Sequence, residues 1–349
     1  MPDYQRILVV QTAFPGDVIL TLPMIQLLKR SFPSAQIDIV VNVNSADLLK
    51  HHPAVSNIFP FDKRGTDSGL KGLRKLSNTL RERKYEIAIV PHRSIRSALI
   101  VVFAGIARRV GFDKSAGWFL FTDAVHYEKS FHEVERNISL LNSIGIHSES
   151  REYPQLYPSD EDVKTVDRLF SENNFAGVPV IAVAPGTVWN TKRWPAEHFT
   201  DLTKKLIKAG HNVVLVGGSA DAELCETVRR TVFSPQIISL AGKMSFLQSA
   251  ELIRRSKLLI SNDSAPMHLA VAMQTPVVAI FGATIPGFGF APYGKYDRVV
   301  ETLGLDCRPC SIHGGDECPV KTFYCMKNIS AETVFAQALE VMKAAKGST

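Results

Sequence analysis

The chain has 349 residues, 45% of them hydrophobic and 21% charged, and a formal net charge of +6, which fits a soluble globular protein of about two domains. It contains no apolar run of about 18 residues, so no transmembrane helix is expected. The apolar run near the N-terminus is too short for a signal peptide, and we therefore expect a cytoplasmic protein.

The first part of the chain alternates short β-rich runs with segments of helical periodicity. This alternation predicts a parallel sheet with helices on both faces. The expected strands are 6–11, 35–43, 58–61 and 87–90, and the expected helices are 18–32, 45–51, 69–84 and 94–105. A polar, proline-containing stretch at 151–177 then indicates the link between two domains.

The second part repeats the alternation. The expected strands are 180–184, 212–216, 237–240, 258–260 and 277–281, and the expected helices are 198–209, 222–230, 245–255, 265–273 and 331–345. We therefore predict an α/β fold with an N-terminal domain over 1–155, a C-terminal domain over 156–330 and a terminal helix over 331–349. Ligands of open α/β sheets bind beyond the carboxyl ends of the strands, and four polar segments follow predicted strands there. We expect these segments to face one crevice.

The first polar segment runs from Gln11 to Asp17 and opens a helix. Asp17 suits either of two roles. It can cap the helix by accepting a backbone N–H, or it can act as a general base that removes the proton of an acceptor hydroxyl. The helix dipole keeps a carboxylate ionised at this position, and Gly16 lets a substrate approach the backbone closely.

The second polar segment, Ala184 to Pro195, combines small residues, a hydroxyl and two cations. These groups suit a pyrophosphate, because Thr187 can donate a hydrogen bond and Lys192 can neutralise charge on a leaving group. The segment matches neither the P-loop nor the G-x-G-x-x-G motif. The alternative interpretation is a basic surface loop.

The third and fourth segments also open predicted helices. In the third, Asp221 and Glu223 are alternative ligands of ribose hydroxyls, and a helix cap is the equally plausible structural role. The fourth, Ser261 to His268, offers helix-start amides to an anion, and Asp263 suits sugar hydroxyls. His268 is either a structural hydrogen-bonding residue or an acid or base.

Four of the five cysteines lie close together near the C-terminus: Cys307, Cys310, Cys318 and Cys325. A C-x2-C pair supplies two thiolates for zinc, but the second pair has other spacing, so reduced, packed cysteines are the favoured interpretation and zinc is the minority one. Cys225, which stands alone, is expected to be a buried thiol.

The segment 62–114 is strongly basic, with 13 Lys and Arg against 5 Asp and Glu. A cationic field of this kind favours an anionic ligand or a membrane surface. On charge alone, the candidate acceptor-binding residues are Lys63, Arg64, Arg93 and Arg96. No nucleic-acid partner is expected, since basic and aromatic residues are not interleaved.

Together these segments resemble glycosyltransferase family nine, the lipopolysaccharide heptosyltransferases. The resemblance covers nearly the whole chain. Its specific parts are G-D-x3-T-L-P at 16–23, P-G-x5-K-R-W-P at 185–195 and N-D-S-x2-M-H at 262–268. The cysteine tail also resembles that of the second heptosyltransferase of the family.

The resemblance implies a GT-B fold, in which two Rossmann-like domains have parallel sheets facing a central cleft. It also implies a Gram-negative enzyme that transfers L-glycero-D-manno-heptose from ADP-heptose to the inner core of lipid A-linked oligosaccharide, with inversion. No cofactor is required. The enzyme would remain at the cytoplasmic face of the inner membrane, in peripheral contact with it.

Carried over by motif, the resemblance implies a role for most of the candidate residues. Asp17 would be the general base, with Gly16 beside the acceptor. The implied donor-binding residues are Thr187, Lys192, Asp221, Glu223, Met244, Asp263, Ser264, Ala265 and His268. Ala265 stands where the family pattern often has glycine.

Two alternatives remain open. One is a related transferase that uses another nucleotide sugar or acceptor. The other is a nucleotide-binding oxidoreductase, against which the missing G-x-G-x-x-G motif argues. The acceptor heptose, the exact donor sugar, metal binding by the cysteines, the oligomeric state and the strength of membrane association are not predicted.

Overall fold

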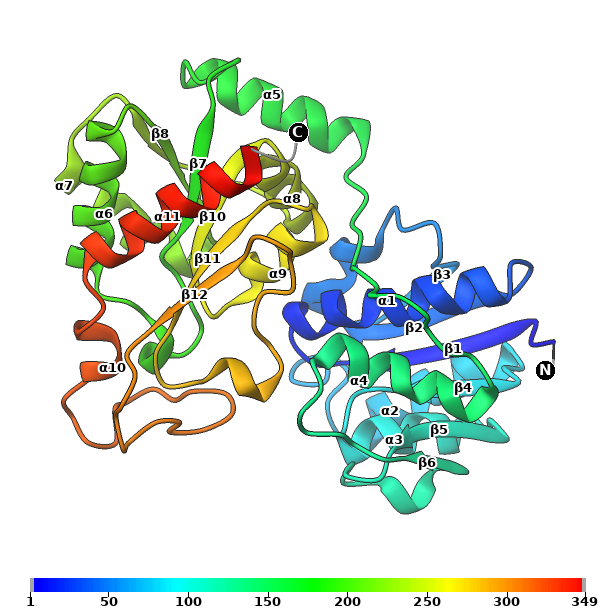
Figure 1. Cartoon of the computed structure of the whole chain (residues 1–349). Helices are drawn as coiled ribbons and strands as arrows, with labels where there is room; N and C mark the ends of the chain where they lie inside the picture. The colour runs from blue at the N-terminus through cyan, green and yellow to red at the C-terminus, as the bar shows by residue number, and fades with distance from the viewer. Residues whose placement is uncertain (1–2, 347–349) are drawn as a thin grey trace. The chain divides into compact units, whose positions relative to one another are not determined.

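The computed structural model describes residues 3–346, and its contacts divide the chain into unit 1, Met1–Tyr157, and unit 2, Pro158–Thr349 (Figure 1). The division lies two residues beyond the predicted boundary. Much of the predicted link is helix α5 (Asp160–Glu172), which packs on α8 (Phe246–Arg254) of unit 2. Within 3–346, no helix has the length and apolar character needed to traverse a bilayer.

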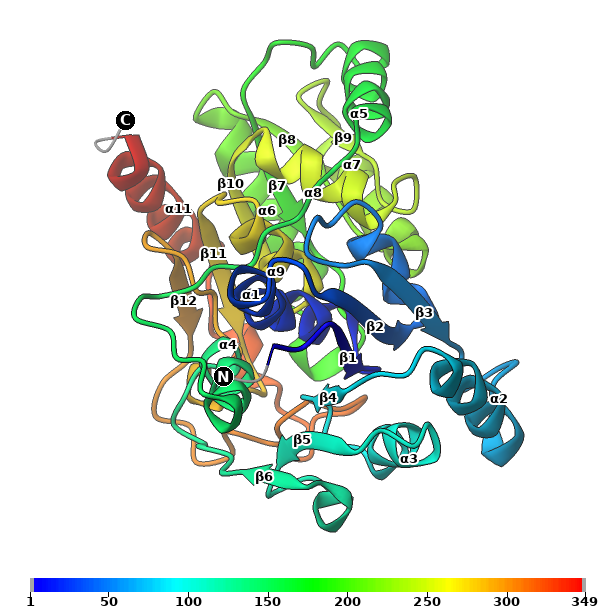
Figure 2. The same ribbon diagram turned by 90° about the vertical axis from the view of Figure 1, so that its right-hand side faces the viewer.

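Unit 1 is a parallel six-stranded sheet covered by helices on both faces. Its strands are β1 (Arg6–Gln11), β2 (Gln36–Asn42), β3 (Asn57–Phe61), β4 (Ile87–Val90), β5 (Arg108–Phe112) and β6 (Asp123–Val125). Its helices are α1 (Pro15–Ser31), α2 (Gly69–Glu82), α3 (Ile95–Phe103) and α4 (Glu133–Ser139), with 3₁₀ helices η1 (Val43–Leu49), η2 (Trp118–Leu120) and η3 (Leu140–Ile144). Helix α1 packs with α4, and α2 packs with α3 on the other face (Figure 2).

The central elements of unit 1 form where apolar runs are continuous. Strand β1 is buried at every residue after Arg6, as expected for a parallel strand covered on both faces. Helix α1 starts at Pro15, three residues before the predicted start, because proline at the first helical position already has a helical φ and needs no hydrogen-bonded N–H. Residues 18–28 of α1 are all buried, so this helix anchors the unit.

Unit 2 repeats the architecture. Its strands are β7 (Val180–Ala184), β8 (Asn212–Leu215), β9 (Ile237–Ser239), β10 (Ser256–Asn262), β11 (Val277–Phe281) and β12 (Arg298–Glu301). Besides α5 and α8, its helices are α6 (Ala196–Lys208), α7 (Ala222–Val232), α9 (Ala265–Ala272), α10 (Tyr324–Lys327) and α11 (Ala331–Lys346), with 3₁₀ helices η4 (Asn190–Lys192), η5 (Ser219–Asp221) and η6 (Pro286–Phe288). Helix α11 packs on α6 and on β10, β11 and β12, so it is part of unit 2.

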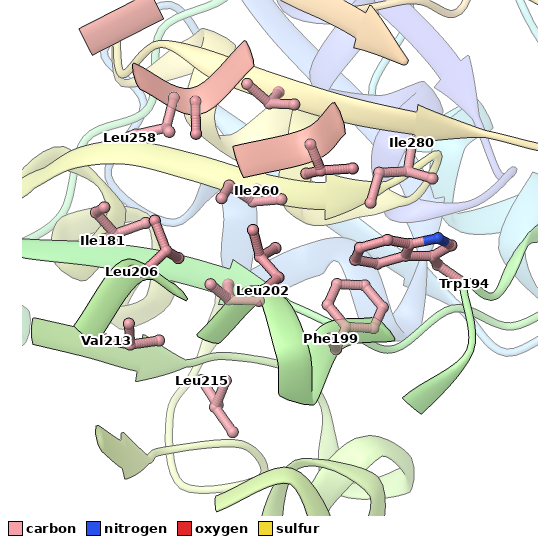
Figure 3. Packing of buried hydrophobic residues seen from close by; sticks show 14 of the residues in the cluster. Ile181, Trp194, Phe199, Leu202, Leu206, Val213, Leu215, Leu258, Ile260 and Ile280 are labelled. Atoms are coloured by element: carbon pink, nitrogen blue, oxygen red, sulfur yellow. The ribbon is translucent and has the colours of Figure 1, made fainter. Parts of the chain in front are cut away.

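The core of unit 2 is closed by Trp194, whose side chain is fully buried. Its ring meets Phe199 edge-to-face at 4.8 Å between centroids, beside Leu202 and Ile260 (Figure 3). The indole N–H donates to the carbonyl oxygen of Ile329 at 2.9 Å. Burying this large ring with its polar atom satisfied fixes the loop that carries Lys192.

Both sheets have the same strand order, β3-β2-β1-β4-β5-β6 in unit 1 and β9-β8-β7-β10-β11-β12 in unit 2. This is the dinucleotide-fold order, and it places a topological switch point between β1 and β4 and another between β7 and β10. The predicted α/β class with two Rossmann-like parallel sheets is therefore confirmed.

Candidate functional site

The switch point of unit 2 is held together by Asn262, the last residue of β10. Its side-chain amide donates to the carbonyl oxygen of Pro185 at 2.8 Å, and its side-chain oxygen accepts the backbone N–H of Trp194 at 3.1 Å. Asn262 is fully buried, so these bonds lock the loop after β7 against the end of β10. Two segments predicted to act together are thus joined directly.

An ion pair lies at this point. Lys192 Nζ donates to Asp263 Oδ2 at 2.7 Å, and the side chains are only 13% and 8% exposed. The hydroxyl of Thr284, in the loop after β11, donates to the same carboxylate oxygen at 2.7 Å. Asp263 therefore positions the lysine, and a diphosphate arriving here would meet an ammonium group that is already oriented.

Two further contacts shape the loop after β7. The carbonyl oxygen of Thr187 accepts a hydrogen bond from Arg193 Nη2 at 2.8 Å. Arg193 Nε is buried and has no hydrogen-bond partner within the described residues. Arg193 was not among the predicted donor-binding residues, yet it sets the course of the backbone at Thr187, whose side chain is largely buried.

Asp221 packs against glycine backbone. A Cβ added at Gly186 would lie 2.0 Å from the Asp221 carboxyl carbon, so only glycine fits there without a shift. Asp221 Oδ2 accepts the N–H of Gly218 at 2.9 Å, which makes the carboxylate a cap of this turn as well as a candidate ribose ligand. Glu223, in the first turn of α7, is exposed.

Helix α9 starts directly after Asp263, with Ser264 as N-cap and Ala265 as its first residue. Pro266 at the second position has no N–H, so the start of this helix offers an anion one amide fewer than a helix start without proline would. His268 is buried within α9. Met244 is half-buried just before Ser245, the N-cap of α8.

In unit 1, Asp17 is the third residue of α1. Its Oδ2 accepts the backbone N–H of Phe14 at 3.1 Å, so the capping role is present. Gly16 precedes it in the same turn. Burial lowers the pKa of Lys63, and the charge of Asp17 acts against this shift. Burial raises the pKa of Glu133 to about 7, and the charge of Asp17 contributes to this increase. The carboxylate thus has a cation and a second carboxyl group as electrostatic neighbours.

The predicted acceptor cations gather around the same switch point. Lys63 Nζ donates to the carbonyl oxygen of Thr12 at 2.7 Å, and Arg96 Nη1 donates to the carbonyl oxygen of Lys63 at 3.0 Å. The guanidinium of Arg93 lies 4.3 Å from the centroid of the Tyr127 ring. Arg64 is exposed beside them.

A histidine that is not among the predicted site residues also lies here. His92 follows β4, and its Nδ1 is 3.0 Å from the hydroxyl of Thr12 and 2.8 Å from that of Ser97. Burial, with the charges of Lys63 and Arg93, lowers the pKa of His92 to about 4, so the imidazole is neutral near neutral pH. The signal in the sequence is its place two residues after the end of β4, directly after Pro91.

The loop between β12 and α10 carries Cys307, Cys310 and Cys318, and the guanidinium of Arg308 holds it in place. This guanidinium donates to the carbonyl oxygens of Gly282, Thr302 and Thr284, and to the carboxylate of Glu301 at 2.8 Å. The loop is therefore fixed beside Thr284, the partner of the ion pair.

The cysteine thiols differ in chemistry. Burial raises the pKa of Cys325 to about 11 and that of Cys225, the buried thiol, to about 12. Burial also raises the pKa of Cys310. Burial acts on Cys318 in the same direction, but hydrogen bonds from the backbone N–H groups of residues 320–323 outweigh it and lower the pKa of this thiol. Cys307 is partly exposed, and all five are free thiols. Across residues 3–346, no three His, Cys, Asp or Glu side chains assemble into a metal-binding group, so zinc stays the minority hypothesis.

Comparison with known proteins identifies the family of the chain. A model of glycosyltransferase family 9 (heptosyltransferase) matches residues 73–319. Lipopolysaccharide heptosyltransferase 2 of Escherichia coli K12 is 31% identical over 309 residues, which are 85% of this chain and 88% of that relative.

Solved structures agree. The structure of Escherichia coli ADP-heptose lps heptosyltransferase II has a TM-score of 0.81 at 27% identity, covering 98% of this chain and 100% of that one. A glycosyl transferase family 9 structure from Veillonella parvula DSM 2008 has a TM-score of 0.89 with 99% of each chain covered, and its 23% identity supports the fold alone. The resemblance predicted from the motifs is confirmed: the chain belongs to glycosyltransferase family 9, the heptosyltransferase family, and is a glycosyltransferase.

Proposed function

We propose that the chain transfers L-glycero-D-manno-heptose from ADP-heptose to the inner core of lipid A-linked oligosaccharide, with inversion, in lipopolysaccharide biosynthesis. Family membership and the named relatives support this reaction. The observation that carries it is the Lys192–Asp263 pair at the switch point of unit 2. It supplies a positioned cation for a diphosphate beside a carboxylate for sugar hydroxyls.

In the proposed reaction, Asp17 takes the proton of an acceptor heptose hydroxyl. The acceptor oxygen then forms a bond to the anomeric carbon of the donor heptose. The bond from that carbon to the diphosphate oxygen breaks, and ADP departs with the electron pair. Lys192 and the first amides of α9 offset the charge that develops on the leaving group, as a preorganised site does for a developing anion.

The remaining donor residues have proposed places in this scheme. Thr187 donates to the diphosphate, Asp221 or Glu223 binds the ribose, and the backbone at Met244 meets adenine. Ser264 and Ala265 supply amides, and His268 supports their helix from within the core. Arg193 acts indirectly, because it holds the backbone of Thr187.

The acceptor side of the proposal rests on charge. Lys63, Arg64, Arg93 and Arg96 form a cationic group at the switch point of unit 1, and an inner-core acceptor carrying anionic groups complements it. We also propose that the enzyme works at the cytoplasmic face of the inner membrane, in peripheral contact with the surface that holds its acceptor.

A direct assay tests the function. Purified full-length chain is incubated with ADP-heptose and a truncated, water-soluble core acceptor, and the product is read by mass spectrometry. We expect an acceptor extended by one heptose, together with free ADP. An unextended acceptor, with extension instead from another sugar nucleotide in a parallel panel, would support the related-transferase alternative. Family membership sets the oxidoreductase alternative aside.

A further inference from the structure

Unit 1 exposes two large aromatic side chains side by side in η2. Trp118 is 54% exposed and Phe119 is 62% exposed, and their rings meet edge-to-face. Ile95, at the start of α3, is 44% exposed and lies against the same loop through Gly117. We call Ile95, Trp118 and Phe119 the aromatic tip. Contiguous exposed apolar side chains of this size mark interaction surfaces.

The aromatic tip is held by a rigid base. Gly117 fits tightly on α3, since a Cβ there would lie 2.8 Å from that of Ala98. The carbonyl oxygen of Leu120 accepts a hydrogen bond from Arg109 Nε at 2.8 Å. The ring of Phe121 fills the space over Gly111, so the loop is anchored at its far end too. The two aromatic rings are therefore presented to solvent by a fixed backbone.

The tip is joined to the cationic group described above. The backbone N–H of Ala116 donates to the carbonyl oxygen of Arg93 at 3.0 Å, and Ile95 is followed at once by Arg96. Lys114, two residues before Ala116, is exposed. An apolar projection thus lies directly beside several cations.

Charge around the tip is predominantly positive. Helix α2 packs beside α3 and adds exposed Lys71, Arg74 and Lys75. Two nearby carboxylates already have hydrogen-bond or ion-pair partners. Asp113 accepts from the backbone of Tyr127 and lies 2.9 Å from His126 Nδ1, and Asp123 is paired with Arg108 at 3.0 Å. The surface of α2, α3 and η2 therefore complements an anionic partner.

We propose that the aromatic tip docks unit 1 onto an anionic lipid surface, with Trp118 and Phe119 entering the interface and the neighbouring cations contacting lipid phosphates. Tryptophan favours the water–lipid boundary, and clustered Lys and Arg are attracted to anionic lipids. The inference rests on the proposed function in one respect: a lipid-linked acceptor is presented at such a surface. It assigns the contact to particular residues.

The test uses the full-length chain and vesicles of phosphatidylethanolamine with phosphatidylglycerol, compared with vesicles of phosphatidylcholine. We expect sedimentation with the anionic vesicles only. The double variant Trp118→Ser/Phe119→Ser should bind them about a hundredfold more weakly, because each buried aromatic side chain contributes about tenfold. Phe233→Ser is the matched control, since Phe233 is 93% exposed at the end of α7 in unit 2. It should bind vesicles as the parent does.

Equal vesicle binding by the parent chain and the double variant would overturn the proposal. The proposal would also be overturned if the double variant sedimented without lipid as a smaller assembly than the parent chain and still bound vesicles as well as the parent does. The aromatic tip would then contact a second copy of the chain. Circular dichroism and ADP binding, which reports on unit 2, verify that the double variant is folded. Turnover of the water-soluble acceptor separates the two proposals: its absence in the parent defeats the proposed function, whereas vesicle binding is judged independently.

Discussion

The two units share one strand order but use their switch points differently. In unit 1 the carboxyl ends of β1, β3 and β4 bring together a helix-capping carboxylate, four cations and a neutral histidine. In unit 2 the ends of β7 and β10 hold a nearly buried, internally neutral Lys–Asp pair on glycine-rich backbone. The comparison teaches that topology sets where a ligand binds, while the short loops set its chemistry.

The largest expected effect concerns the carboxylate at the switch point of unit 1. Asp17→Asn should lower kcat about 10²–10⁴-fold, because the amide cannot take the acceptor proton. ADP affinity, measured by titration calorimetry, should not change. Asp162→Asn is the matched control: Asp162 is also the third residue of its helix, and it accepts the N–H of Ser159 at 2.9 Å. If both variants lose turnover equally, Asp17 acts only as a helix cap.

The next effect concerns the ion pair of unit 2. Lys192→Ala should weaken ADP binding roughly 10–100-fold, since a charge-assisted hydrogen bond is lost and Asp263 is left without its cation. Lys204→Ala, an exposed lysine of α6, is the control and should leave binding unchanged. ADP affinity retained in the Lys192 variant would remove this residue from the donor site.

A smaller effect tests the glycine-lined side of unit 2. Gly186→Ala should lower the free energy of unfolding by about 1–3 kcal/mol, because the new methyl group displaces the Asp221 carboxylate. Gly218→Ala is the control, since its Cβ would stay 3.8 Å from Asp221. Urea unfolding measures both. Adding Asp221→Ala to Gly186→Ala should restore part of the loss, and no rescue would contradict the steric explanation.

The smallest effect concerns the neutral histidine of unit 1 and the pH dependence of stability. The pKa of His92 is lowered in the folded state, so the unfolded chain binds more protons between about pH 6.5 and about pH 4, and stability falls as pH falls through that window. His92→Gln should reduce the loss of unfolding free energy between about pH 7 and about pH 5 by about 1 kcal/mol. His51→Gln, at an exposed site, should not. Burial also lowers the pKa of His52 to about 4, and its contribution to the pH dependence of stability is the same in both variants.

The sequence predicted the strands whose apolar runs are continuous, because burial on both faces leaves a clear pattern. It missed β5, which begins with Arg108 and Arg109, and it missed β12 and the short β6. Edge and polar strands form through pairing with a neighbour, and a single segment carries no signal of that pairing.

At the candidate site, motif positions singled out candidate loops but did not predict the hydrogen bonds and ion pairs that these loops form. The pairing of Lys192 with Asp263 joins residues from separate strand ends, and Thr284 joins them from a third. Arg308 supports the site from a loop predicted only as a cysteine cluster. Such contacts depend on backbone geometry that residue spacing does not encode.

Ile329 lies 135 residues after Trp194 in the chain, and its carbonyl oxygen is 2.9 Å from both Trp194 Nε1 and His198 Nδ1. During synthesis on the ribosome, unit 1 can fold while unit 2 is still emerging. The segment bearing Lys192 reaches its final anchorage only after Ile329 has been made and has left the ribosome. A nascent chain would therefore acquire the final form of its Lys192 loop only after unit 1 is complete.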